Sequence, residues 1–113
     1  MDKHSLSQFM EYSSEKFTKR VIFKKGESTA FVLNFTPGQQ LPPHKHPGTE
    51  VFLLVKGGSG TFTIDGVEHE AVANDVVHCG GEEMFAFKNS GSEPVSLYVV
   101  LTKVPSPEYA KDI

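Results

Sequence analysis

Cysteine is nearly absent from this sequence, which also lacks an excess of basic charge and any long apolar segment. Its 113 residues contain one Cys, which excludes an internal disulfide framework and a zinc site built from several cysteines. Lys and Arg number 11 against 14 for Asp and Glu, and the net charge of −3 argues against a dedicated nucleic-acid-binding protein. The apolar run Val51–Val55 is far shorter than the roughly 20 residues of a membrane-spanning helix.

The first residues are polar and mixed in charge, without the apolar segment of a signal peptide. From this and from the single free cysteine we expect a cytoplasmic protein that binds neither membranes nor nucleic acid. The length corresponds to one domain with one packed core.

Turn-forming residues are plentiful, with ten Gly and seven Pro, and they separate short apolar runs. Asp65-Gly66 between two alternating runs is a strong hairpin signal. No window shows a sustained helical period, so the sequence predicts an all-β sandwich or barrel. The predicted strands cover residues 21–23, 29–35, 41–46, 50–55, 61–64, 67–70, 76–79, 84–88 and 95–103.

We expect three parts along the chain. Residues 1–18 form an N-terminal arm, either with a short helical turn after Ser5 or frayed. Residues 19–104 form the barrel, and residues 105–113 form a loosely held tail. The pairs Lys19-Arg20 and Lys24-Lys25 flank an apolar strand, and we interpret them as protection of a sheet edge.

The residues that carry chemistry are concentrated at His44, His46 and Glu50. Residues two apart in a strand point to the same face, so the two imidazoles should lie side by side. Pro47-Gly48 then turns the chain, and Glu50 can swing back toward them. Two imidazoles and one carboxylate can hold a divalent metal and leave positions open for water or substrate. The alternative is a pair of solvated or hydrogen-bonded histidines beside a surface acid.

The spacing around these residues follows the first motif of the cupin family. Five residues separate Gly38 from His44, one separates His44 from His46, three separate His46 from Glu50, and six separate Glu50 from Gly57. Residues 66–89 resemble the second motif in their frame. The chain therefore resembles a small single-domain cupin over about residues 28–103. The resemblance implies a double-stranded β-helix, or jelly-roll barrel, that often dimerises and usually holds one transition metal.

The second motif departs from the family pattern at its metal ligand. The family usually has a His four residues before the closing Asn, and Phe85 stands there, four residues before Asn89. Phe cannot bind a metal, so Phe85 would give the barrel an apolar wall. Two interpretations follow: a three-ligand site with lower metal affinity, or a metal-free barrel in which the histidines form hydrogen bonds. His78, Glu82 and Glu83 are the nearest substitutes for the missing ligand, but His78 is out of phase with the inward-facing positions.

Other conspicuous side chains have plainer interpretations. Cys79 is expected to be a small core residue rather than a nucleophile. His69, beside a hairpin turn, is expected to face solvent. A set of phenylalanines is expected to form the core: Phe31, Phe35, Phe52, Phe62, Phe85 and Phe87.

We therefore expect a cupin that binds one divalent transition metal (Mn, Fe, Ni or Zn) through His44, His46 and Glu50 and binds or acts on a small organic molecule. The alternative is a non-catalytic, metal-free binding protein or a structural dimer. A homodimer is expected because the apolar strand predicted from Val95 would otherwise be an exposed edge.

Overall fold

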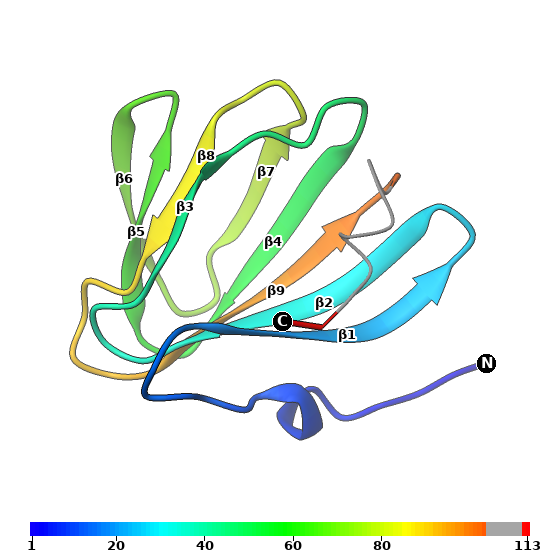
Figure 1. The fold of residues 1–113 in the computed structure, drawn as a ribbon, viewed down its shortest axis with the longest axis horizontal. Helices are drawn as coiled ribbons and strands as arrows, with labels where there is room; N and C mark the ends of the chain where they lie inside the picture. Colours follow the sequence, from blue (N-terminus) through cyan, green and yellow to red (C-terminus); the bar gives the residue numbers. More distant parts are fainter. Residues whose placement is uncertain (104–111) are drawn as a thin grey trace.

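The computed structural model describes residues 1–103 and 112–113, in which nine strands form two facing sheets (Figure 1). In chain order the strands are β1 (Thr18–Lys25), β2 (Ser28–Phe35), β3 (Gln40–His44), β4 (Glu50–Lys56), β5 (Ser59–Ile64), β6 (Val67–Val72), β7 (Val76–Gly80), β8 (Phe85–Lys88) and β9 (Val95–Leu101). One sheet has the order β1-β2-β9-β4-β7 and the other has the order β3-β8-β5-β6. All of their pairings are antiparallel, and the predicted all-β fold is confirmed.

The hairpin that Asp65-Gly66 predicts joins β5 to β6. Both residues have positive φ angles, 49° and 81°, as the favoured two-residue turn between antiparallel strands requires. The turn sets Ile64 opposite Val67 and fixes the register of the pair. Local turn chemistry thus determines the register here.

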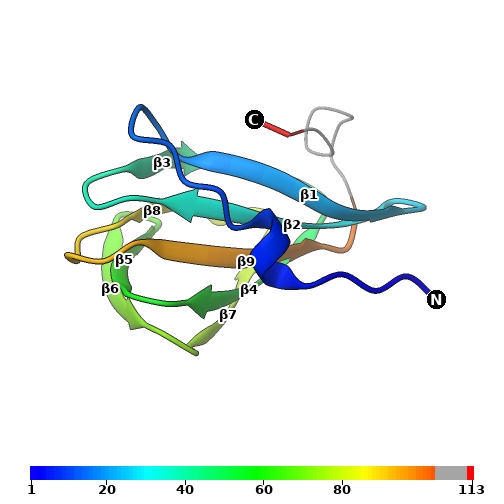
Figure 2. The ribbon, with the colours of Figure 1, turned by 90° about the horizontal axis from the view of Figure 1, so that it is seen from below.

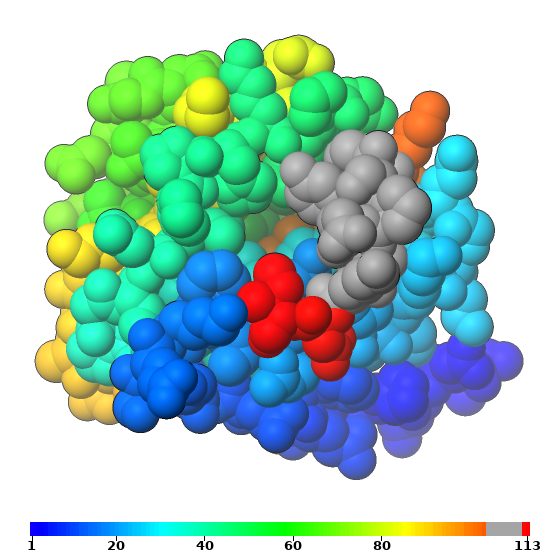
Figure 3. Space-filling model, in the orientation of Figure 1, coloured from blue at the N-terminus to red at the C-terminus, as the bar shows by residue number. Residues whose placement is uncertain are grey.

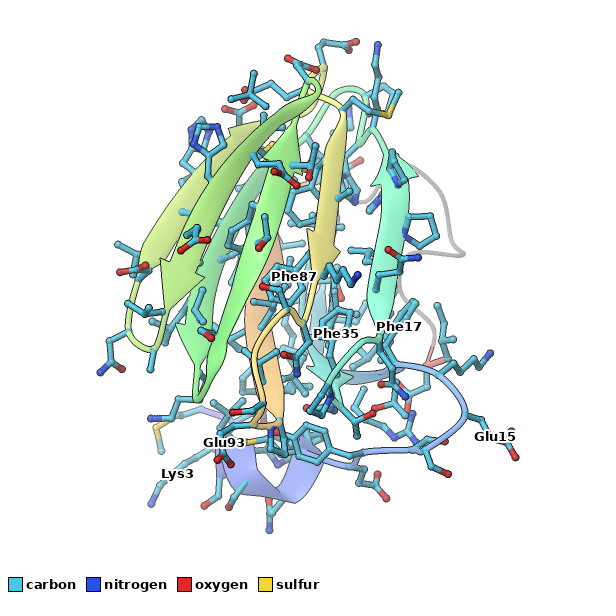
Figure 4. The ribbon with its side chains drawn as sticks, turned by 90° about the vertical axis from the view of Figure 1, so that its left-hand side faces the viewer. Lys3, Glu15, Phe17, Phe35, Phe87 and Glu93 are labelled. Atoms are coloured by element: carbon cyan, nitrogen blue, oxygen red, sulfur yellow. The ribbon has the colours of Figure 1, made fainter. Side chains whose placement is uncertain are left out.

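The core lies between the two sheets and is rich in aromatic side chains. Phe35 is 5.0 Å from Phe87 and 5.4 Å from Phe17 between ring centroids, and Figure 4 shows these three residues close together. Five of the six phenylalanines predicted for the core are buried. The prediction is wrong for Phe52, which is 45% exposed because it alternates with buried Val51 and Leu53 along β4.

The last strand is not a sheet edge. β9 pairs with β2 on one side and with β4 on the other, which places it in the middle of the five-stranded sheet. Its apolar composition is explained by this position, because the inner face of a central strand packs against the core. The argument for a homodimer from an exposed β9 edge is therefore wrong.

Both ends of the described chain contact the barrel. The arm contains a short 3-10 helix, η1 (Leu6–Phe9), without a side-chain cap from Ser5, and it lies across β1, β2 and β9 (Figure 2). Asn34 donates a hydrogen bond to the Phe9 carbonyl, at 2.9 Å, and holds the arm on the sheet.

The expected loosely held tail lies mostly outside the described residues. Its last two residues are held: Ile113 exchanges two backbone hydrogen bonds with Lys19, and Asp112 accepts one from the Val21 N–H group. These contacts connect the end of the chain to β1. Among the described residues, no helix is long and apolar enough to cross a membrane.

Candidate functional site

A cavity of about 330 Å³ opens into the barrel between the two sheets. Its mouth lies on the face shown in Figure 3, where atoms of β9 are visible in a hollow between β3 and the red atoms of residues 112–113. Most of its walls are apolar, as is typical of cavities that bind small molecules. The described residues that line it are Phe17, Lys19, Phe31, Leu33, Leu41, Pro42, Pro43, His44, His46, Val51, Phe85, Val99 and Ile113.

His44 and His46 lie side by side in this cavity, as predicted. His44 ends β3 opposite Phe85 of β8, and His46 follows two residues later. The two ring centroids are 4.5 Å apart, and the His46 residue is only 5% exposed. The sequence pattern therefore identified two polar groups that converge on one point.

Backbone contacts fix the position of His46. Its N–H group donates to the Gly81 carbonyl at 3.0 Å, and its carbonyl accepts from the Thr49 N–H group at 3.1 Å. A side chain at position 81 would overlap the His46 carbonyl, so glycine is required there for the two loops to meet. Gly81 thus permits the close approach that carries His46 into the cavity.

The protonation of the two imidazoles follows from their surroundings. His44 Nδ1 lies 2.9 Å from the Pro42 carbonyl oxygen, which only accepts, so Nδ1 donates and the neutral ring has its lone pair on Nε2. Burial lowers the pKa of His46 to about 4, with further lowering by His44 and Lys19. His46 is therefore neutral at pH 7.

Glu50 does not join the two histidines. Its Oε1 atom lies 2.8 Å from His78 Nε2 on the outer face of the five-stranded sheet, where both side chains are about half exposed. The cause is the alternation of β4: Val51 is fully buried and lines the cavity, so Glu50 faces the opposite side. The structure brings together two of the three predicted metal ligands and leaves the third apart. Within residues 1–103 and 112–113, no group of three His, Cys, Asp or Glu side chains could hold a metal ion.

Phe85 points into the barrel, as expected for the position of the missing ligand. The residue is 2% exposed, and its ring centroid lies 5.5 Å from that of His44 and 6.4 Å from that of His46. It forms a wall of the cavity without closing it. His78 faces outward, as predicted, and Glu82 is exposed, so neither replaces the missing ligand. Glu83 accepts a hydrogen bond from the Gly80 N–H group at 2.8 Å.

Lys19 is a cavity residue that the sequence reasoning missed. It was interpreted as a guard of the sheet edge, but it is 6% exposed and lines the cavity, so that interpretation is wrong. The available signal was the period of two along β1, which places Lys19 on the same face as Val21, a residue packed against the core. A positive charge is unusual on the inward face of a strand. The alternation along β1 nevertheless predicts correctly that Lys19 faces inward.

Cys79 is a core residue, as predicted. It is 2% exposed, and burial raises the pKa of its thiol to about 11, with a further contribution from Glu83. A thiol with a raised pKa is a poor nucleophile. His69, on β6, is exposed, also as predicted.

The sequence comparison decides the family. The family model of the cupin domain matches residues 31–101, more than half of the chain. This chain belongs to the cupin family. The match includes the two histidines, Glu50 and Phe85, whereas Phe17, Lys19 and Ile113, which also line the cavity, lie outside it.

Relatives of this cupin have different functions. It is 28% identical over 93 residues to auxin-binding protein 1 of Arabidopsis thaliana, covering 75% of this chain and 47% of the relative. It is 43% identical over 51 residues to the dimethylsulfoniopropionate lyase DddW of Ruegeria pomeroyi, covering 45% of this chain and 33% of the relative. The cupin therefore spans less than half the length of these curated relatives.

Solved structures support the fold. A Klebsiella pneumoniae protein with a double-stranded β-helix domain superposes with a TM-score of 0.84 at 21% identity, covering 100% of this cupin and 96% of that chain. The expected double-stranded β-helix is confirmed.

Proposed function

We propose that this cupin binds a small organic molecule in its barrel cavity, with His44 and His46 as polar contacts. The observation that carries the proposal is a cavity that Phe85 lines but does not fill, lined also by the partly buried His44 and the buried His46. Small-molecule sites combine mainly apolar walls with a few convergent polar groups, and this cavity has both.

The size and chemistry of the cavity limit the ligand. A volume of about 330 Å³ lies at the lower end of the range for ligand pockets, so a molecule about the size of one substituted ring is expected. His44 Nε2 can accept a hydrogen bond from it. The named functions of relatives include a binding protein and a lyase, so the family is compatible with binding alone and with catalysis.

Binding can be tested with benzamide, a neutral ring-sized probe, by NMR titration of the protein. Val99→Phe adds a ring to a residue that lines the cavity and should weaken benzamide binding at least about tenfold. Val100→Phe is the matched control, because Val100 follows Val99 on β9 and lines the outer groove of the same sheet. The proposal fails if neither benzamide nor benzoate, its charged counterpart, binds, or if the two variants weaken binding equally.

A metal site at His44, His46 and Glu50 is the second candidate. The orientation of His44, with Nε2 free of the Pro42 contact, and the neutral state of His46 favour it, since metals bind neutral imidazoles. Because Glu50 is hydrogen-bonded to His78, the arrangement as it stands supplies two ligands and does not fit a complete three-ligand site.

Titration with Mn, Fe, Ni or Zn tests the second candidate, which fails if none of these metals binds. If Glu50 is a ligand, Glu50→Gln should lower metal affinity about as much as His44→Ala does. If only the histidines bind, Glu50→Gln should leave metal affinity unchanged, and His44→Ala should reduce it. The second result is the one we expect from the contact between Glu50 and His78.

A further inference from the structure

Among residues 1–103 and 112–113, the ionisable groups that line the barrel cavity are basic. They are Lys19, His44 and His46, and no Asp or Glu of residues 1–103 and 112–113 lines the cavity. The other described residues that line it are aliphatic, aromatic or proline. A cavity with this composition favours a ligand that carries negative charge on an apolar body.

The register of the five-stranded sheet directs Lys19 inward. Lys19 on β1 pairs with Leu33 on β2, and directly opposite residues of antiparallel strands share a face. Leu33 lines the cavity, and so does Phe31, two residues earlier. Lys19 Nζ lies 4.3 Å from the Phe31 ring centroid, so the aromatic ring holds the ammonium group by a cation–π contact.

We infer that the cavity selects organic anions, with the Lys19 ammonium group binding a carboxylate and the apolar walls enclosing a ring-sized body. This inference rests on the proposed function, since it requires that the cavity bind a ligand. A charge-assisted hydrogen bond in a cavity screened from water is stronger than the same contact at the surface. The carboxylate should therefore contribute strongly to affinity.

The charges around Lys19 are compatible with an additional anion. Burial lowers the pKa of Lys19, and Asp112, whose side chain accepts a hydrogen bond from the Val21 N–H group, raises it. His46 is neutral at pH 7, so it adds no competing positive charge beside the ammonium group. A bound carboxylate would favour the charged form of Lys19, in the same direction as Asp112 does.

The test compares benzoate with benzamide, which have the same ring and nearly the same shape but differ in charge. In the wild type, benzoate should bind about 10- to 100-fold more tightly than benzamide, as expected for a hydrogen bond to a charged group. Lys19→Met removes the charge and keeps the chain length, so it should equalise the two affinities by weakening only benzoate binding. Lys19→Arg keeps the charge and should retain the preference.

Lys24→Met is the matched surface control, because Lys24 lies on the same strand and is exposed. It should behave as the wild type. Equal affinities for benzoate and benzamide in the wild type, or a preference that survives in Lys19→Met, would overturn the inference while leaving cavity binding intact. If neither benzoate nor benzamide binds, the proposed function is overturned as well. If Lys19→Met does not fold, Lys19→Gln provides the same comparison.

Discussion

Glu50 and His78 are hydrogen-bonded across β4 and β7, with 2.8 Å between Oε1 and Nε2, on the opposite face of the sheet from the histidine pair. The first cupin motif implies that Glu50 lies in the cavity with the histidines. In the structure, Glu50 instead lies on the outer face and contacts His78. The pair is about half exposed, so it contributes little to folding stability. The contact shows that Glu50 lies on the outer surface of the sheet. Among the described residues, the ionisable groups that line the cavity are therefore basic.

Restoring the family's fourth ligand should create a metal site. In Phe85→His, an imidazole would replace a ring whose centroid lies 5.5 and 6.4 Å from those of His44 and His46, so three imidazoles would converge. We expect zinc affinity to rise at least about tenfold, and stability to fall by about 1–3 kcal/mol because a polar group enters the core. Calorimetric zinc titration measures the first effect and urea unfolding the second. Phe85→Leu is the control, and an equal gain in that variant would contradict the explanation.

The pH dependence of stability should carry a contribution from His46. The unfolded imidazole takes up a proton near pH 6.5, whereas the folded one does so only near pH 4. The unfolded state therefore binds more protons between these values, so this contribution is fully present above pH 6.5 and is lost as pH falls toward 4. It amounts to up to about 3 kcal/mol. Urea unfolding at pH 7 and pH 4.5 should show a smaller loss of stability for His46→Gln, and an identical loss would contradict the assignment.

Cys79 should react slowly with thiol reagents in the folded protein. Its pKa is raised from 9.0 to about 11, which reduces the thiolate fraction about 100-fold, and its burial slows access further. At pH 8, alkylation by iodoacetamide should be at least about 100-fold slower in native protein than in protein unfolded in urea. Mass spectrometry of the time course measures both rates. Rapid labelling of native protein would instead indicate an activated cysteine.

The predicted homodimer has a better candidate surface than a β9 edge. The outer face of the five-stranded sheet exposes Phe52 (45%) and Val76 (78%), with Leu54, Tyr98 and Val100 around them. We propose that a second copy of the chain covers this face. Light scattering should give a mass near twice 12.4 kDa for the wild type and near 12.4 kDa for Phe52→Lys. Val67→Lys, on the other sheet, should remain dimeric. A wild-type mass of one chain would contradict the proposal.

Strand positions could be predicted from the sequence because they depend on local properties. Alternating apolar residues and turn residues such as Asp65-Gly66 act within a few residues, and each predicted strand is present. The pairing of β9 between β2 and β4 could not be predicted, since pairing partners are distant in the chain. For the same reason an apolar strand at the centre of a sheet was interpreted as an exposed edge.

The sequence by itself determined that His44 and His46 share a face, because two residues in one extended segment have a fixed geometry. The resemblance to the second cupin motif placed Phe85 where the family usually has a His ligand. Only the tertiary structure decided the positions of Glu50 and Lys19. A turn separates Glu50 from the histidine pair, and the phase of the next strand turned its side chain toward His78. The pairing of β1 with β2 turned Lys19 into the cavity, because a side chain on a paired strand must face one side of the sheet or the other.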